Sequence, residues 1–166
     1  MEIQNIPMHY IETHAHIYSS KFDSDRDQVI QDIRNAGIER IYMPNVYVET
    51  IEAMLACEKK YPDLCIPMMG LHPCDVKDDF REQLAVMEDW LNKRQFAAVG
   101  EIGLDLYWDK TFFKQQKEAL KIQINWAKEK ELPIVLHCRE SMDETIAIVK
   151  EEHDGKLKGI FHCFNG

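Results

Sequence analysis

Five of the seven histidines share one place in the sequence pattern. Each comes directly after a short apolar, β-prone run, and one glutamate occupies the same place after another such run. The six residues are His14, His16, His72, Glu101, His137 and His162. Because the carboxyl ends of parallel strands meet at one mouth in α/β folds, we expect these side chains to converge there.

The spacing His14-Ala15-His16 indicates a cation site. Residues i and i+2 of a strand point to the same side, so both imidazoles can face one ion. A carboxylate on an adjacent strand can bridge two ions about 3.5–4 Å apart, the arrangement used for phosphoester hydrolysis. Glu101 is the one carboxylate placed to do so. The sequence therefore predicts one or two divalent ions, with Mg, Mn and Zn as candidates. Taken alone, a His-x-His pair would equally fit two surface or core histidines.

Strand and helix signals alternate along the whole chain. The apolar runs lie at residues 10–13, 40–43, 65–70, 96–100, 134–136 and 159–161, with amphipathic segments between them. Strict alternation implies a parallel sheet with helices packed outside. Six units fit an open doubly wound sheet, whereas a (β/α)₈ barrel needs eight units and typically about 250 residues. Periodicity alone leaves this choice open. With no linker in the pattern, we expect residues 1–166 to form a single domain.

Local helix signals accompany this pattern. Phe80, Leu84 and Met87 form an apolar stripe at helical spacing, and Ser141 with Glu144 predicts a capping box at the start of a helix. Tyr107 and Trp108 fall in a loop near the predicted mouth, where they would either stack on a nucleotide base or shield the pocket.

Composition narrows the function classes. The chain has 166 residues, 45% of them hydrophobic and 30% charged, which is an ordinary globular balance. Its net charge of −9 counts against a general nucleic-acid binder but not against a nuclease, because bound cations change the local field. The odd number of cysteines, five, fits reduced thiols. The start of the chain lacks the features of a secretory signal, so we expect a cytoplasmic protein.

Five motifs in order give a resemblance to a known family. They are Glu12-Thr13-His14-Ala15-His16, Gly70-Leu71-His72-Pro73, Gly100-Glu101-Ile102-Gly103-Leu104-Asp105, His137-Cys138-Arg139 and Phe161-His162-Cys163-Phe164-Asn165-Gly166. From about Tyr10 to the last residue the chain resembles the TatD family. Its members are metal-dependent deoxyribonucleases of the amidohydrolase superfamily with a (β/α)₈ fold.

The resemblance implies roles for individual residues. His14 and His16 would bind a first metal, His137 and His162 a second, and Glu101 would bridge both. His72 would lie near the scissile phosphate. Arg139 would hold a phosphate oxygen, for which its guanidinium fork is well shaped. Asp105 would support the site from behind or face the substrate. Glu101, Arg139 and His72 are thus the expected catalytic residues.

Two departures from the family pattern stand out. Glu12 occupies a position where Asp is usual, and it would support the metal site from beneath. The family also has an Asp ligand in a Thr-Asp-x-Pro-like motif after its seventh strand, beyond Gly166, where this sequence ends. We therefore expect six of eight barrel units, weak or no hydrolase activity of this chain alone, and self-association through exposed strand edges.

The resulting functional prediction is a metal-dependent hydrolase of phosphodiester bonds that uses metal-activated water on DNA, with single strands as the expected substrate. Two alternatives remain open: a small-molecule amidohydrolase, and a non-catalytic barrel fragment lacking the final Asp. Arg139 beside His137 favours the phosphodiester hydrolase over the amidohydrolase, because binding a phosphate requires a cation there and binding an amide does not.

Overall fold

Six parallel strands and five α-helices alternate through residues 9–164, the part of the chain that the computed structural model describes. In chain order the elements are β1 (Tyr10–Glu12), η1 (Ser20–Phe22), α1 (Arg26–Asn35), β2 (Ile38–Pro44), η2 (Val48–Thr50), α2 (Ile51–Lys60), β3 (Cys65–Met68), η3 (Pro73–Asp75), α3 (Phe80–Lys93), β4 (Val99–Asp105), α4 (Phe113–Glu129), β5 (Ile134–Arg139), α5 (Met142–Glu152) and β6 (Gly159–Phe161). The predicted alternation is confirmed.

The strands follow one another in space as they do in sequence. Two parallel sheets have the orders β1-β2-β3 and β4-β5-β6. A parallel bridge between Met69 and Val99 joins them, with the Gly100 N–H donating to the Met69 carbonyl at 2.9 Å. A doubly wound sheet would reverse its strand order at a switch point. The uninterrupted order is that of a (β/α)₈ barrel wound in one direction, and six strands of it lie in the described residues.

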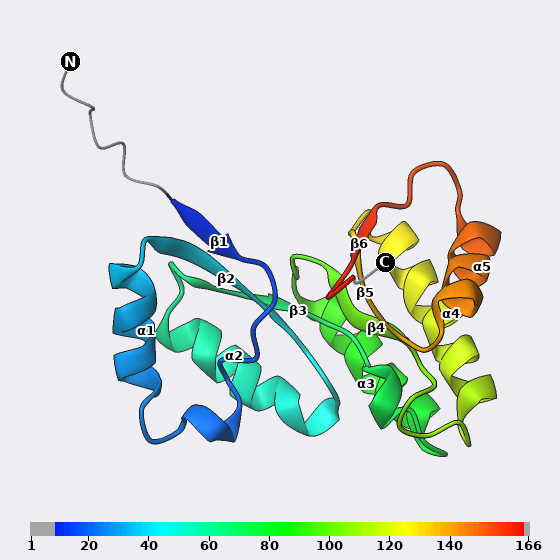
Figure 1. The fold of residues 1–166 in the computed structure, drawn as a ribbon, viewed down its shortest axis with the longest axis horizontal. Coiled ribbons are helices and arrows are strands. Elements are labelled where there is room, and N and C mark those ends of the chain that lie inside the picture. Colours follow the sequence, from blue (N-terminus) through cyan, green and yellow to red (C-terminus); the bar gives the residue numbers. More distant parts are fainter. Residues whose placement is uncertain (1–8, 165–166) are drawn as a thin grey trace.

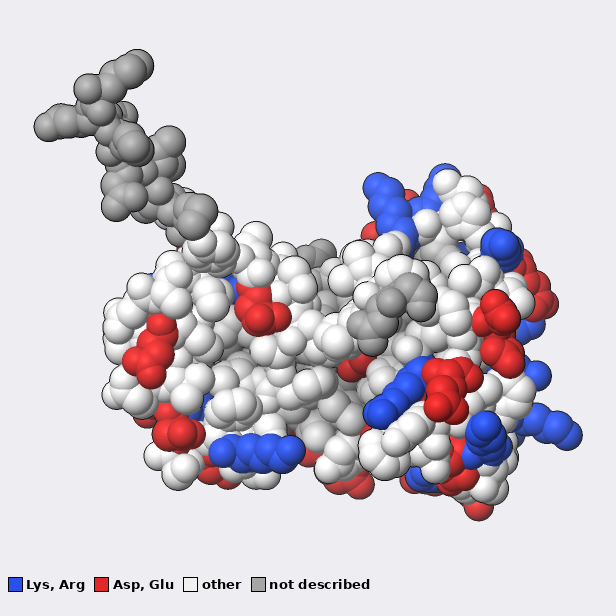
Figure 2. Space-filling view, viewed as in Figure 1, with Lys and Arg blue, Asp and Glu red and all other residues white. Residues whose placement is uncertain are grey.

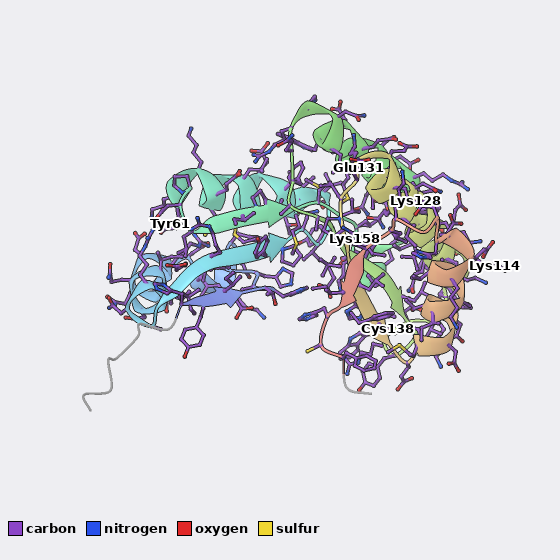
Figure 3. The ribbon with its side chains drawn as sticks, turned by 90° about the horizontal axis from the view of Figure 1, so that it is seen from above. Tyr61, Lys114, Lys128, Glu131, Cys138 and Lys158 are labelled. Carbon is purple, nitrogen blue, oxygen red and sulfur yellow. The ribbon has the colours of Figure 1, made fainter. Side chains whose placement is uncertain are left out.

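The helices lie on the outer side of the strands (Figure 1). The strands β1–β3 carry α1 and α2, and β4–β6 carry α3, α4 and α5. Seen from above, Lys158 at the start of β6 and Cys138 near the end of β5 mark opposite ends of the strands (Figure 3). The site residues all belong to the Cys138 end, because the strands run parallel.

Each face of the sheet has its own apolar cluster. Ile134 and Leu136 of β5 belong to the large core between strands and helices, whereas Val135 packs with Met68 and Ala98 in a small cluster on the inner face. This alternation follows from the period of two in a strand. It also continues along β5, so that His137 and Arg139 follow Val135 on the inner face.

The fourth strand differs from its prediction. The sequence suggested residues 96–100, with Glu101 just beyond the strand end, but β4 spans Val99–Asp105 and Glu101 lies inside it. Gly100 and Gly103 interrupt the apolar run and disguise a strand whose residues are all buried. The register with β5 also shifts between Gly100 and Ile102.

The capping box predicted at Ser141 and Glu144 is wrong. Ser141 does precede α5, but its side chain makes no capping hydrogen bond. Its hydroxyl instead donates to the Leu104 carbonyl at 2.7 Å, which ties the start of α5 to β4. This tertiary contact directs the Ser141 side chain toward β4, and its oxygen accepts no N–H from the first turn of α5.

Apolar side chains are exposed along the two outermost strands. Ile11 of β1 is 57% exposed and Ile160 of β6 is 50% exposed. Within residues 9–164, β1 pairs with β2 alone and β6 with β5 alone. The expected self-association through these edges stays a prediction. None of the helices in this part of the chain has the length and apolar character needed to cross a bilayer.

Gly103 allows β4 and β5 to approach closely beside the site. Its φ is +146°, and a Cβ built there would lie 1.9 Å from the carbonyl oxygen of His137. Any side chain at this position must displace the β5 backbone that carries His137.

We expect Gly103→Ala to destabilise the fold by more than ~2 kcal/mol, because it combines an unfavourable φ with a backbone overlap. Gly155→Ala is the matched control: its φ is +85°, and nothing lies within 4 Å of the added Cβ. The free energy of unfolding of that variant should fall only by the cost of a left-handed φ in alanine, about 1–2 kcal/mol. Urea unfolding measures both, and equal losses would contradict the overlap.

Candidate metal centre

The carboxylate of Glu101 lies at the centre of the histidine cluster and is 3% exposed. Its Oε2 is 3.0 Å from Nε2 of His14, and its Oε1 is 3.1 Å from Nδ1 of His137. Nε2 of His16 is 3.8 Å from Oε2, and Nε2 of His72 is 4.0 Å from Oε1. Histidines from three separate strands or strand ends thus share one buried carboxylate of a fourth strand, and the predicted convergence is found.

Glu101 remains ionised in this setting. Burial alone would raise its pKa, but hydrogen bonds from His137 and His14 outweigh burial and hold the pKa well below its usual range. The cluster therefore presents a fixed negative charge among imidazoles at neutral pH.

The grouping of the histidines departs from the expected pairs. His162 lies against His14, with ring centroids 3.4 Å apart and planes 11° from parallel. Ligand atoms of His14, Glu101 and His162 lie within 4.8 Å of one another, and so do those of His72, Glu101 and His137. The family pattern had instead suggested His162 beside His137. His162 reaches His14 because the outermost strands β1 and β6 both end toward the same mouth.

Tyr18 fixes the tautomer of His16. The Tyr18 hydroxyl donates its single proton to the Pro44 carbonyl at 2.5 Å, and burial raises the pKa of this tyrosine, so it keeps that proton. The hydroxyl oxygen therefore accepts from Nδ1–H of His16, 3.0 Å away. Burial is also the main cause that lowers the pKa of His16. Neutral His16 thus turns an unprotonated Nε2 toward Glu101, ready to bind a cation.

His72 has the opposite tautomer. Its Nδ1 accepts the backbone N–H of Cys74 at 3.1 Å, so the neutral ring carries its proton on Nε2. Burial lowers the pKa of His72 to about 4, which keeps it neutral at pH 7. Although its geometry would allow metal binding, this side chain offers the site an N–H donor in place of a lone pair.

Asp105 holds His137 from behind. Its Oδ2 is 2.8 Å from Nε2 of His137, while Nδ1 of the same ring faces Glu101. Burial alone would lower the pKa of His137, but the two carboxylates raise it. A carboxylate behind a histidine is the arrangement that orients metal-binding imidazoles in proteins.

The donor set fits a divalent cation. Nδ1 of His14 is buried and has no hydrogen-bond partner among the described residues. A buried polar atom of this kind is rare unless a ligand satisfies it. Imidazoles around a carboxylate also suit zinc and its neighbours in the first transition row.

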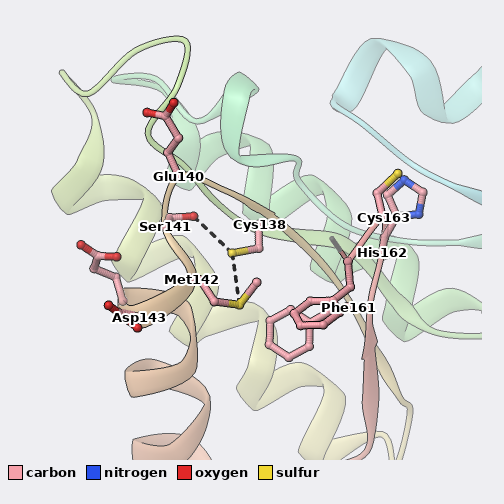
Figure 4. A pocket seen from close by; sticks show the side chains of 10 residues that line it. Cys138, Glu140, Ser141, Met142, Asp143, Phe161, His162 and Cys163 are labelled. Atoms are coloured by element: carbon pink, nitrogen blue, oxygen red, sulfur yellow. Dashed lines mark hydrogen bonds between the residues drawn. The ribbon is translucent and has the colours of Figure 1, made fainter. Parts of the chain in front are cut away.

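Three further residues lie at the margin of the cluster. Glu12 is exposed and accepts the backbone N–H of His14 at 2.9 Å, so it shapes the loop that carries the histidines without entering the cluster. Arg139 is exposed and packs over the ring of Tyr107. A hollow beside the cluster is lined by the loops after β5 and β6, where the Cys138 thiol contacts Ser141 and Met142 (Figure 4).

Two residues of the site escaped the sequence analysis. Tyr18 is the next member of the alternation that contains His14 and His16, and this spacing was a usable signal. Asn45 directly follows β2 and is fully buried. Its side chain donates to the Gly70 carbonyl at 3.0 Å, and its own carbonyl accepts the N–H of Glu101. It stands at a strand end like the histidines, so the same rule would have found it.

Comparison with known proteins identifies the lineage of this site. A family described as "TatD related DNase" matches residues 11–166. The chain belongs to this family. The expected resemblance is confirmed.

Named relatives agree with the family match. The chain is 36% identical over 155 residues to "Uncharacterized metal-dependent hydrolase YabD" of Bacillus subtilis, covering 93% of this chain and 60% of that protein. It is 30% identical over 152 residues to "3'-5' ssDNA/RNA exonuclease TatD" of Dickeya dadantii, covering 92% and 58%. The chain thus spans about three fifths of the length of the curated relatives it matches.

Solved structures show the same fold. The TatD homologue YjjV of Escherichia coli superposes with a TM-score of 0.86 at 31% identity, over 95% of this chain and 61% of that one. A TatD-family hydrolase of Entamoeba histolytica has a TM-score of 0.78 at 22% identity, over 98% and 60%. The TIM-type barrel is therefore the fold class of the chain.

The two tautomers are testable by NMR. In metal-free protein at pH 7.5, ring ¹H–¹⁵N correlations should show His16 protonated on Nδ1 and His72 on Nε2. Tyr18→Phe should remove the Nδ1 proton from His16 and leave His72 unchanged. Tyr42→Phe serves as control, since no hydrogen bond of its hydroxyl is found in residues 9–164. An Nε2-protonated His16 in the unaltered protein would contradict the assignment.

Proposed function

We propose that the protein is a divalent-metal-dependent hydrolase that cleaves phosphodiester bonds in single-stranded DNA. The observation that carries the proposal is the position of Glu101, with His14 on one carboxylate oxygen and His137 on the other. The printed names of the relatives support the same chemistry, namely a metal-dependent hydrolase and an exonuclease of single-stranded DNA and RNA.

The ions would be held by five residues, namely the shared carboxylate and four histidines around it. They are Glu101, His14, His16, His137 and His162. Bound divalent ions lower the pKa of a coordinated water and polarise the phosphate. The unprotonated Nε2 of His16 and the unpartnered Nδ1 of His14 support this assignment.

Other side chains would act on the substrate. His72 directs its Nε2–H into the site and would donate to a phosphoryl oxygen. Arg139 follows His137 by two residues on the inner face, and its fork would hold a second phosphate oxygen. Both groups offset negative charge that develops on those oxygens during cleavage. Asp105 keeps His137 in place throughout.

Glu101→Gln tests the metal assignment, because it keeps the shape of the side chain and removes its charge. Metal-loaded wild-type protein should contain about one to two ions per chain, and the variant fewer. Turnover of a single-stranded oligonucleotide should fall at least ~10²-fold in the variant. Elemental analysis and a gel assay measure the two quantities.

Glu118→Gln is the matched control, since Glu118 makes a surface pair with Arg81 on the helices. This variant should retain both metal and turnover. Unchanged metal content in Glu101→Gln would refute the bridging role, and turnover that does not depend on Glu101 would refute the proposed hydrolase.

Arg139→Lys separates substrate binding from metal binding. Lysine keeps the charge but lacks the bidentate fork, so turnover should fall about tenfold while metal content stays constant. Loss of metal together with unchanged turnover per remaining ion would show that Arg139 serves the metal centre instead.

A further inference from the structure

An exposed aromatic surface stands at the mouth of the site. Trp108 is 69% exposed and Tyr107 is 48% exposed, directly after β4. Their ring centroids are 4.8 Å apart at 85°. The guanidinium carbon of Arg139 lies 3.7 Å from the ring centre of Tyr107 and 5.1 Å from that of Trp108. We call Tyr107, Trp108 and Arg139 the aromatic ledge.

The ledge is fixed to the metal centre through one carboxylate. Oδ1 of Asp105 accepts the backbone N–H groups of Tyr107 at 3.0 Å and Trp108 at 3.1 Å. Its other oxygen holds His137. Backbone pairing adds a second tie, because the Leu106 N–H donates to the Arg139 carbonyl at 2.9 Å. The exposed rings are therefore held at a set place beside the cluster.

Arg139 has donors available for a ligand. Within residues 9–164 its side chain contacts the two rings, and no carboxylate or carbonyl pairs with it. A guanidinium has five N–H donors in a planar fork that matches a phosphate. Stacking on Tyr107 orients that fork without consuming the donors.

Charge elsewhere in the molecule gives little attraction for a polyanion. The net charge is −9. On the face drawn in Figure 2, lysines and arginines are interspersed with carboxylates and form no continuous basic stripe. A nucleic-acid strand would have to gain its affinity from stacking and from a few local contacts rather than from a broad basic surface.

We propose that the aromatic ledge binds one unpaired nucleotide of the substrate strand, with the base stacked on Trp108 and an adjacent phosphate held by Arg139. The inference rests on the proposed function and identifies the side chains that would select its single-stranded substrate. A base inside a duplex has both faces covered by its neighbours, so the ledge selects unpaired strands.

Binding by the metal-free full chain isolates the ledge from catalysis. A fluorescein-labelled ten-nucleotide oligothymidylate and an abasic strand with the same phosphates are titrated in EDTA and followed by anisotropy. Wild-type protein should prefer the base-bearing strand by about 5- to 150-fold, the range expected for loss of one base–aromatic stack. Tryptophan fluorescence should be quenched by the base-bearing strand.

Trp108→Ala should reduce this preference to near unity and abolish the quenching. Trp90→Phe is the matched control, because Trp90 is a half-buried tryptophan of α3. It should keep both signals. Arg139→Ala should weaken binding of both strands alike and flatten the salt dependence by a log–log slope of about 0.7, the contribution of one phosphate in a single strand.

A preference for bases that survives in Trp108→Ala overturns the proposal, and so does a wild-type protein that binds both strands equally. The proposed hydrolase fails separately, if turnover of the metal-loaded protein does not depend on Glu101, whether or not the base preference is observed. Thermal unfolding followed by circular dichroism verifies that each variant is folded.

Discussion

The buried negative charge of Glu101 constrains the architecture of this protein. An isolated buried carboxylate is costly, and Glu101 is tolerable only because imidazoles surround it. Those imidazoles come from widely separated parts of the chain, so the loops after β1 and β3 and the end of β5 must all reach β4. The winding of the strands and the close approach at Gly103 meet this requirement.

Hydrogen-bond partners outside the cluster divide the histidines around Glu101 into two kinds. A tyrosine hydroxyl leaves His16 with a free lone pair, whereas the amide of Cys74 leaves His72 with a proton. The residue type is identical and the chemistry is opposite. One class of group suits a cation and the other suits an anionic oxygen, and both face the same carboxylate.

Much of this arrangement was predictable from the sequence, and the exceptions have identifiable causes. Strand-end placement sufficed to gather His14, His137 and the other cluster members, because parallel strands share one mouth. The limits of β4 were missed because two glycines interrupt its apolar run. Ser141 was misread because its acceptor, the Leu104 carbonyl, is distant in sequence. The tautomers depend on atoms that only the folded chain brings within hydrogen-bond reach.

The two carboxylate oxygens of Asp105 bind different parts of the site, and this has a thermodynamic consequence. One oxygen steadies the imidazole behind the shared carboxylate, and the other steadies the loop that bears the exposed rings. When a ligand orders either His137 or the loop that carries Tyr107 and Trp108, the other partner loses less conformational entropy on binding its own ligand. By linkage, occupancy at the metal cluster and occupancy at the loop should favour each other to the same extent, whichever comes first.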